Sequence, residues 1–360
     1  MNRTIFVFRS LVVSQIILFM LVSPAFSSGR HQKIDAVSSA TSLALQKKFP
    51  DGISLKIFGK VRKIYNLNSS YLSTLATVRI RTKEVDPQGE VTGAYIYNGF
   101  PVYFLLDGIR PQKNSNDKFD RPLDLIVTFI SKTGKRSHFS YGELTMCNDT
   151  FPVTLAFNRE PVLPSKDPES YKKNRETKPL VGLRLICPRD RNNYRYLDQV
   201  VSIEMFLPRT SDKILPKLVK GDRCLSNKLF CIKKGNKYES SFSGIKIKTF
   251  KNWVRIGHGR GIKSKNPETV SGYSLRNFLV NNFGSSNIDD FFMFVGCDGY
   301  RSLFSWSEIF HTYAGERMII ITQRNGKPIR NNITLGITND FFVDRDIHGL
   351  SYIEKITFLE

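Results

Sequence analysis

The sequence predicts an α+β protein built from two tandem copies of one module. Short alternating apolar runs typical of strands are interspersed with short helical patterns, which is not the strict alternation of a doubly wound parallel fold. The segment Asp290–Phe310 holds an apolar run, an Asp-Gly turn, a second short run and a helix start, and a diverged copy occupies Asp124–Leu144. Other marker residues recur in the same order along most of the chain.

The repeat is defined by an ordered series of matches. A single matched Gly or Pro is weak evidence because these residues recur in turns everywhere, but an ordered series favours tandem duplication. The matches are Gly134–Ser137 with Gly299–Ser302, Phe139–Glu143 with Phe304–Glu308, Gly59 with Gly235, Val78–Ile80 with Val254–Ile256, Gly99 with Gly272, Asn158–Pro161 with Asn325–Pro328, Asp190 with Asp340, and Ile203–Glu204 with Ile353–Glu354.

Residues 1–27 have the composition of an export signal. Arg3 and Arg9 give a basic start, Leu11–Val22 is an apolar run, and Ala25–Ser27 is a small-x-small cleavage site. The sequence therefore predicts a periplasmic or secreted protein, with no transmembrane segment after removal of the signal.

Beyond the signal, composition divides the chain into modules. We expect a first module at 28–207, a connector at 208–228 and a second module at 229–360. The polar, charged and proline-containing stretch 163–179 has no counterpart in the second copy and indicates an insertion loop in the first.

The elements of each module follow from local patterns. Alternation with β-branched residues predicts a strand at Ile53–Val61 and another within Tyr71–Arg81. In each copy a turn glycine precedes helically spaced apolar residues, which are Val102, Leu105 and Leu106 after Gly99, and Leu275, Phe278 and Leu279 after Gly272.

Two serine–glutamate pairs mark helix starts. Ser140 stands three residues before Glu143, and Ser305 stands three residues before Glu308. This spacing is that of a capping box, in which the glutamate serves the helix terminus and has no catalytic role.

The charge balance indicates which partners the protein attracts. The net charge is +22, and it is still +20 after Arg3 and Arg9 are removed with the signal. Such a field attracts anions. The basic residues are spread over both halves and no zinc-finger, homeodomain or RNA-recognition signature is present, so a specific nucleic-acid partner is not predicted.

Five cysteines in an exported chain raise the question of disulfides. Cys224 and Cys231 lie close together in a polar connector and are the candidate pair. Cys147, Cys187 and Cys297 stand beside apolar runs and are expected to be buried free thiols. The sequence has no CxxC pair, so no metal site is predicted.

A family resemblance emerges from the repeat. In order, the second copy carries Gly272-x-x-Leu275-x-x-x-Leu279, Asp298–Tyr300, Phe304-Ser305, Glu308-Ile309, Asn325–Pro328 and Ile353-Glu354. This series resembles the molybdopterin-binding domain of the sulfite oxidase family, and the first copy, which includes the strand Val181–Pro188, resembles it more weakly. The resemblance covers about 53–207 and 229–360 and implies layered mixed β-sheets with short helices. It also implies an oxidoreductase, a molybdopterin cofactor and a redox partner protein.

The sequence departs from that family at the metal. The family's molybdenum-ligating cysteine would fall in Val78–Glu84 or Val254–Lys265, and neither segment contains a cysteine. Because molybdenum needs a soft thiolate ligand, we expect a binding or accessory protein without the cofactor, acting on an anionic small ligand or a redox partner. The alternatives are an active molybdopterin-dependent oxidoreductase with atypical ligands, and a basic envelope protein that binds polyanions.

The site-like stretch is the glycine-rich Gly257–Lys265. Within it, His258, Gly259, Arg260 and Lys263 are candidates to bind an anion or the pterin phosphate. The competing interpretation is a basic surface turn.

A second pair of candidates follows the Asp-Gly turn. Tyr300 and Arg301 either face a ligand or pack across the strands. No catalytic residue is predicted, because the sequence has no HExxH spacing and no Gly-x-Ser-x-Gly elbow.

Overall fold

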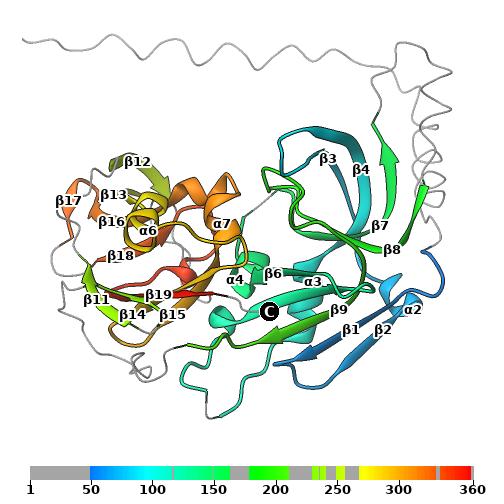
Figure 1. Ribbon diagram of the computed structural model, residues 1–360, viewed down its shortest axis with the longest axis horizontal. Helices are drawn as coiled ribbons and strands as arrows, with labels where there is room; N and C mark the ends of the chain where they lie inside the picture. Colours follow the sequence, from blue (N-terminus) through cyan, green and yellow to red (C-terminus); the bar gives the residue numbers. More distant parts are fainter. Residues whose placement is uncertain are drawn as a thin grey trace, which may run out of the picture. The chain divides into compact units, whose positions relative to one another are not determined.

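The computed structural model describes residues 49–115, 117–148, 150–162, 178–210, 229–234, 236–240, 249–255, 267–329 and 333–357. Short strands dominate, and the longest described helix has 9 residues, so the architecture is α+β as predicted (Figure 1). The predicted signal, residues 163–177 of the insertion predicted at 163–179, and most of the connector fall outside the described residues. Residues 178 and 179 begin a strand, and the module boundaries stay predictions.

The first copy forms one nine-stranded sheet, with its main path in the order β2-β1-β9-β8-β7-β4-β3 and with β5 and β6 branching from β9. Its helices are short and connect strands of this sheet. The strands are β1 (Ser54–Gly59), β2 (Tyr65–Asn68), β3 (Val78–Val85), β4 (Val91–Pro101), β5 (Ile126–Ser131), β6 (Arg136–Ser140), β7 (Thr154–Pro161), β8 (Lys178–Ile186) and β9 (Leu197–Phe206). The helices are α2 (Ser69–Leu72), α3 (Val102–Ile109), the 3-10 turn η1 (Pro122–Asp124) and α4 (Tyr141–Thr145).

The second copy forms two five-stranded sheets instead of one. The first contains β10 (Leu229–Lys233), β11 (Asn236–Ser240), β14 (Phe291–Gly296), β15 (Arg301–Ser305) and β19 (Leu350–Ile356). The other contains β12 (Thr249–Arg255), β13 (Glu268–Ser274), β16 (Met318–Arg324), β17 (Lys327–Pro328) and β18 (Thr334–Ile337). The helices are α6 (Leu275–Phe283), α7 (Trp306–Phe310), η2 (Ala314–Arg317) and η3 (Val343–Arg345).

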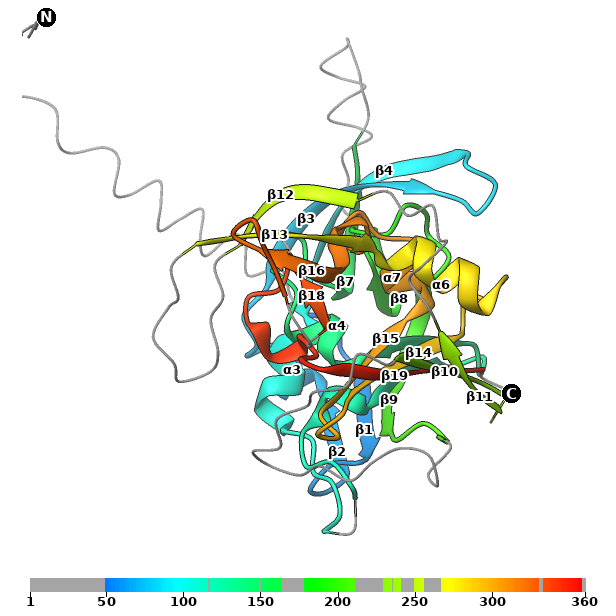
Figure 2. The same ribbon diagram turned by 90° about the vertical axis from the view of Figure 1, so that its left-hand side faces the viewer.

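The sheets of the second copy are layered around a helix. Figure 2 shows α6 between the sheet of β13 and β16 and the sheet of β14 and β15. Leu275, Phe278 and Leu279 of α6 are buried together with Phe292 and Phe294 of β14 in one apolar cluster. The helical spacing predicted from the sequence is therefore confirmed, and burial of this apolar face stabilises the short helix.

Strand register shows that the two copies share one architecture. Ile203 of β9 pairs with Phe129 of β5, and Ile353 of β19 pairs in the same way with Phe294 of β14. In both copies the first strand runs parallel to the last one. The match of Ile203 with Ile353 is thus confirmed by pairing, and the tandem repeat is a property of the structure.

Gly99 and Gly272 are equivalent, but they do not lie in turns as the sequence predicted. Each lies at a β-bulge just before the helix, in β4 and in β13. A Cβ on Gly99 would lie 2.4 Å from the Leu155 carbonyl oxygen, and one on Gly272 would lie 2.0 Å from that of Ile320. Glycine is required because the neighbouring strand approaches the backbone too closely for a side chain.

Two other matches are shifted in the structure. The pairing of β4 with β7 and of β13 with β16 aligns Asn158 with Gln323, whereas Asn325 lies in the turn after β16 with φ +48°. Ile80 aligns with Trp253, not with residue 256. The match of Asn158 with Asn325 was wrong by two residues, because it rested on an Asn-Gly turn motif, which is local and carries no information about strand register. Gly235, the partner predicted for Gly59, lies outside the described residues.

Candidate functional site

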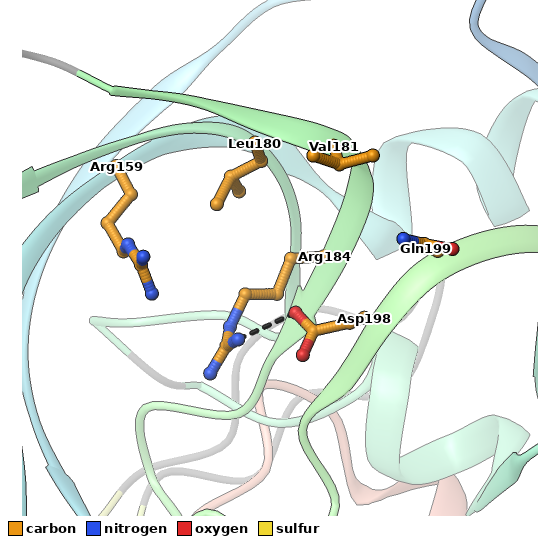
Figure 3. Close-up of a pocket in the computed structure, with 6 residues that line it drawn as sticks. All are labelled: Arg159, Leu180, Val181, Arg184, Asp198 and Gln199. Carbon is orange, nitrogen blue, oxygen red and sulfur yellow. Dashed lines mark hydrogen bonds and ion pairs between the residues drawn. The ribbon is translucent and has the colours of Figure 1, made fainter.

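A hollow of about 350 Å³ opens on the first copy between β7, β8 and β9, and we call it the β7–β9 pocket (Figure 3). Two arginines from neighbouring strands extend their guanidinium groups to the same side of it. The lining residues are Arg159, Leu180, Val181, Arg184, Asp198 and Gln199. The volume is at the small end of the range for ligand pockets.

Arg184 of β8 lies between two carboxylates. Its Nη2 donates to Glu84 Oε1 and Oε2 at 3.1 and 3.2 Å, and its Nη1 donates to Asp198 Oδ1 at 2.6 Å. The Glu84 side chain is 6% exposed, whereas that of Asp198 is 68% exposed. The first ion pair therefore belongs to the core, and the second is a solvent-screened surface pair worth about 0–1 kcal/mol.

Two tyrosines contact the buried ion pair of Arg184 with Glu84. The Tyr97 hydroxyl donates to Glu84 Oε1, and burial raises the pKa of Tyr97 above its ordinary value, so this hydroxyl stays a donor. The Arg184 guanidinium lies 6.0 Å from the Tyr97 ring centroid and 5.8 Å from that of Tyr196. Arg184 Nε is buried without a hydrogen-bond partner among the described residues. Such an unmade bond is uncommon in native proteins.

Arg159 of β7 is held over an aromatic ring. Its guanidinium carbon lies 4.8 Å from the ring centroid of Tyr95. No carboxylate of the described residues forms an ion pair with it, and the adjacent Glu160 pairs instead with Arg79 at 3.0 Å. A cation–π contact positions the arginine without neutralising its charge, so the group remains able to bind an anion.

The backbone at the pocket is strained. Gln199 has φ +53°, and the equivalent residue of the second copy is Gly349 with φ +60°. The equivalence follows from matching hydrogen bonds, since the Lys132 N–H donates to the Gln199 carbonyl and the Cys297 N–H donates to the Gly349 carbonyl. A left-handed non-glycine residue costs about 1–2 kcal/mol, and such strain concentrates at functional sites.

Of the site residues predicted from the sequence, the structure describes Tyr300 and Arg301. His258, Gly259, Arg260 and Lys263 fall outside the described residues, and their role stays a prediction. Tyr300 and Arg301 do not line the pocket. The Tyr300 hydroxyl accepts from Arg121 Nη1 at 3.0 Å and donates to the Asp344 carbonyl, and its ring packs edge-on against Phe119.

Arg301 is also a packing residue. It is 4% exposed, its Nε donates to the Gly299 carbonyl at 3.2 Å, and its guanidinium lies 5.6 Å from the Phe119 ring centroid. Phe119 belongs to the first copy, so Tyr300 and Arg301 hold the two copies together. The packing interpretation is the one that these contacts support.

Two glutamates form a buried junction between the copies. Ser140 and Ser305 cap their helices, as predicted, by accepting from the Glu143 and Glu308 N–H groups. The glutamate side chains do not close capping boxes. Ser305 Oγ donates to Glu143 at 2.8 Å, and Ser140 Oγ donates to Glu308 at 3.2 Å, so each carboxylate reaches the other copy.

Arginines neutralise this junction from both sides. Arg195 lies 2.7 Å from Glu143 and 2.7 Å from Asp190, and Arg345 lies 2.5 Å from Glu308 and 2.6 Å from Asp340. The predicted match of Asp190 with Asp340 is confirmed by these equivalent contacts. The side chains are almost fully buried, and this burial indicates a structural role, not a ligand site. We call these six residues, with Ser140, Ser305 and Arg189, the junction network.

The pKa values of the two junction carboxyl groups are shifted in opposite directions. Burial acts to raise the pKa of Glu143, but Arg195 and Arg189 outweigh it and hold that pKa below its ordinary value. Burial raises the pKa of Glu308 to about 7, and Arg345 offsets only part of this effect. Arg189 lies 3.1 Å from Glu143, whereas the equivalent residue on the Glu308 side is Asn339. Burial, with repulsion from Glu143, therefore outweighs the single close arginine of Glu308, whereas two close arginines outweigh burial at Glu143.

The disulfide prediction was wrong for Cys231. Cys231 is a free, buried thiol, because it faces the core from β10 beside Leu229. Cys224 lies outside the described residues. Cys297 was expected to be free but is disulfide-bonded, and its partner is none of the free cysteines Cys147, Cys187 and Cys231. Cys297 directly follows β14, is half-buried and lies outside the apolar cluster that contains Cys231.

The described cysteines do not fit a molybdenum centre. Burial raises the pKa of Cys147 and Cys187 well above the ordinary value and raises that of Cys231 to about 11. Thiolate ligation needs a deprotonated sulfur within reach of the cofactor. Among the described residues no group of His, Cys, Asp and Glu could hold a metal ion, and no helix is long and apolar enough to cross a membrane.

The sequence analysis did not predict the pocket, although both arginines lie in segments that it named. Arg159 lies in the repeat marker Asn158–Pro161, and Arg184 lies in the family-like strand Val181–Pro188. A usable signal is the alternation of Tyr95 and Tyr97, which places two aromatic rings on one face of a strand. Only the pairing of β4 with β7 brings Arg159 beside them.

The comparisons with known proteins add little to this geometry. No protein-family description matches the sequence. No curated protein matches it either. Among solved structures, the chain is similar to the sulfane dehydrogenase SoxCD from Paracoccus pantotrophus, with a TM-score of 0.31 and 10% sequence identity over 85% of this chain and 78% of that chain. A TM-score of this size carries no argument, so the resemblance to the sulfite oxidase family stays an interpretation of the sequence.

Proposed function

We propose that the protein binds a small anionic ligand in the β7–β9 pocket and acts as a binding or accessory protein. The observation that carries the proposal is that Arg159 lies over an aromatic ring and forms no ion pair with a described carboxylate. In the second copy its equivalent, Arg324, forms an ion pair with Glu268, whose oxygens lie 2.6 and 2.7 Å from Nη1. Register makes Glu268 the equivalent of Tyr95, so the first copy has an aromatic ring where the second has a carboxylate.

Electrostatics favours an anion at this point. A half-buried guanidinium without a carboxylate is partly desolvated and has not regained that energy from a fixed partner. An anion between Arg159 and Arg184 would accept charge-assisted hydrogen bonds, which are about twice as strong as neutral ones. The positive field of the chain would also raise the rate at which anions arrive.

The test is calorimetric titration of the full chain at low ionic strength with sulfate, phosphate and hexanoate. We expect at least one of these anions to bind, and Arg159→Gln to weaken its binding about tenfold or more. Arg81→Gln is the matched control, because it removes the same charge from an exposed position of β3 outside the pocket. If both variants lose affinity equally, binding is a non-specific effect of net charge.

The oxidoreductase alternative has its own measurement. The described cysteines do not supply the thiolate, so the proposal is a protein without molybdenum. Mass spectrometry of the full chain expressed in a molybdenum-replete host checks this. Stoichiometric molybdenum would contradict the proposal and favour atypical ligands.

A second candidate function is polyanion binding at a cell envelope. The segments 211–228, 241–248 and 256–266 together contain ten Lys and Arg residues against two acidic residues. Such local excess of charge is the usual basis of binding to polyanions. Retention on heparin that falls steeply with salt, and that replacement of Arg260, Lys263 and Lys265 by Gln reduces, would favour it.

Export is part of the proposal. It rests on the composition of residues 1–27, and the disulfide at Cys297 supports it because disulfides persist in oxidising compartments. Sequencing the N-terminus of the protein recovered from the periplasm or medium is the measurement. Recovery of the uncleaved chain from the cytoplasm would contradict it.

A further inference from the structure

We infer that the ligand of the β7–β9 pocket is a monocarboxylate with a short apolar body, and that Asp198 occupies the place of its carboxylate when the pocket is empty. The inference rests on the proposed function and narrows it from any small anion to one chemical class. It is carried by the two unequal carboxylates on Arg184.

Glu84 is a permanent partner of Arg184. It is buried, it receives both hydrogen bonds from Nη2, and the Tyr97 hydroxyl holds its Oε1. Removing one partner of a buried pair of this kind leaves an uncompensated charge. Glu84 therefore orients Arg184, with Tyr97 as a second positioning residue.

Asp198 is an exchangeable partner. Its carboxylate oxygen Oδ1 accepts a hydrogen bond from Arg184 Nη1 at 2.6 Å (Figure 3). The Asp198 side chain lies at the mouth of the pocket and is 68% exposed. A surface pair of this kind adds little stability, so another carboxylate can replace it at little cost. The geometry that Arg184 offers there already fits a carboxylate oxygen.

Charge counting selects a monoanion. With Asp198 turned into solvent, the charged groups that the structure describes here are Arg159 and Arg184, which line the pocket, and Glu84, which pairs with Arg184. A single negative charge balances this set, whereas a dianion leaves an excess charge in a half-buried site, which is unfavourable.

The walls select an apolar body. Leu180 is half-buried in an apolar cluster with Tyr95 and Tyr97, and Val181 is 79% exposed at the rim. Covering an exposed aliphatic side chain and the face of Leu180 is favourable for a hydrocarbon group. The small volume limits this body to a few carbon atoms or one ring.

The experiment uses calorimetry on the full chain to compare three six-carbon ligands, hexanoate, adipate and hexan-1-ol, with one another and with inorganic phosphate. We expect hexanoate to bind more tightly than adipate or phosphate, and hexan-1-ol not to bind. Asp198→Ala should tighten hexanoate about 2- to 5-fold, since it removes a competing surface pair. Asp107→Ala, an exposed acidic residue of α3, is the charge-matched control and should leave the affinity within about 1.5-fold.

The outcomes separate the two proposals. If hexan-1-ol binds as tightly as hexanoate, the monocarboxylate class is overturned. The same follows if Asp198→Ala increases the affinity for hexanoate no more than Asp107→Ala does. Binding of phosphate that Arg159→Gln abolishes, with hexanoate no tighter, also overturns the class but leaves anion binding standing. Failure of every anion to bind the wild-type chain overturns the proposed function itself.

Discussion

The two copies place an arginine at the same point of the same strand and give it different neighbours. In the second copy Arg324 pairs with Glu268, and the position equivalent to Arg184 is Thr334, which lies 3.5 Å from His348. In the first copy Arg159 lies on Tyr95, and Arg184 pairs with Asp198. The comparison teaches that duplication kept the scaffold, while a few side chains gave the arginine of one copy a carboxylate partner and the arginine of the other an aromatic ring.

The two copies also differ in how many sheets they form, and the length of one strand explains this difference. β8 has nine residues and pairs with both β7 and β9, whereas β18 has four residues and pairs with β16 but not with β19. The first copy is therefore one continuous sheet, and its strand ends can form a pocket over β7, β8 and β9. The second copy has two separate sheets.

The largest expected effect concerns what the copies share. Arg345→Leu should lower the free energy of unfolding by about 3–5 kcal/mol, because it leaves Glu308 and Asp340 buried without their cation. Urea denaturation measures it. Arg81→Leu, at an exposed position, should stay within about 0.5 kcal/mol of wild type. A loss below about 1 kcal/mol in Arg345→Leu would show that the junction network does not hold the copies together.

The next effect tests the asymmetry of the junction. The pKa of Glu308 is about 7 in the folded protein and lies above its unfolded value, so its stabilising contribution is full below pH ~4.5 and is lost as pH rises through about 7. Glu308→Gln removes this dependence. As pH rises from 5 to 8, the wild type should lose about 2 kcal/mol of unfolding free energy that the variant does not lose. The free energy of unfolding of the variant minus that of wild type should therefore increase by this amount. Parallel pH profiles for the two proteins would contradict the assignment.

A third substitution makes the first copy resemble the second. Tyr95→Glu should supply Arg159 with the carboxylate that Glu268 gives Arg324, and weaken anion binding about tenfold. Tyr95→Phe keeps the ring and should retain binding. Calorimetry with the tightest anion compares the two. If Tyr95→Glu binds as wild type does, the free charge of Arg159 is not what the ligand recognises.

The smallest effect concerns the backbone. Gln199→Gly gives the first copy the residue that the second has at this left-handed position, Gly349. Relief of the strain should raise the free energy of unfolding by about 0.5–1 kcal/mol, after the larger unfolded-state entropy of glycine is subtracted. Thermal unfolding is the measurement. A decrease in stability would mean that contacts of the Gln199 side chain outweigh the strain.

Much of the fold was predictable because its signals are local. The Asp-Gly and Thr-Gly turns place Gly299 and Gly134 at φ +84°, and Ser140 and Ser305 cap their helices as their spacing predicted. The apolar spacing of α3 and α6 identified their buried faces. Register was less predictable, since the displaced match of Asn158 with Asn325 rested on a turn motif alone.

The candidate site was not predictable in the same way. Arg159, Arg184 and Asp198 stand on three strands, and nothing in their separate neighbourhoods says that β7, β8 and β9 bring them together. The same holds for Glu143 and Glu308. Their helix-start spacing predicted a local role, and their side chains instead reach serines 162 and 168 residues away.

The sequence by itself determined the α+β class, the duplicated central unit, the helix caps and the excess of positive charge, because each depends on residues near one another in the chain. Tertiary structure decided which arginine is neutralised. Arg159 and Arg324 look alike in sequence, and only strand pairing places Tyr95 beside one and Glu268 beside the other. Partner choice is a long-range property, set by register and burial, and the proposed function depends on it.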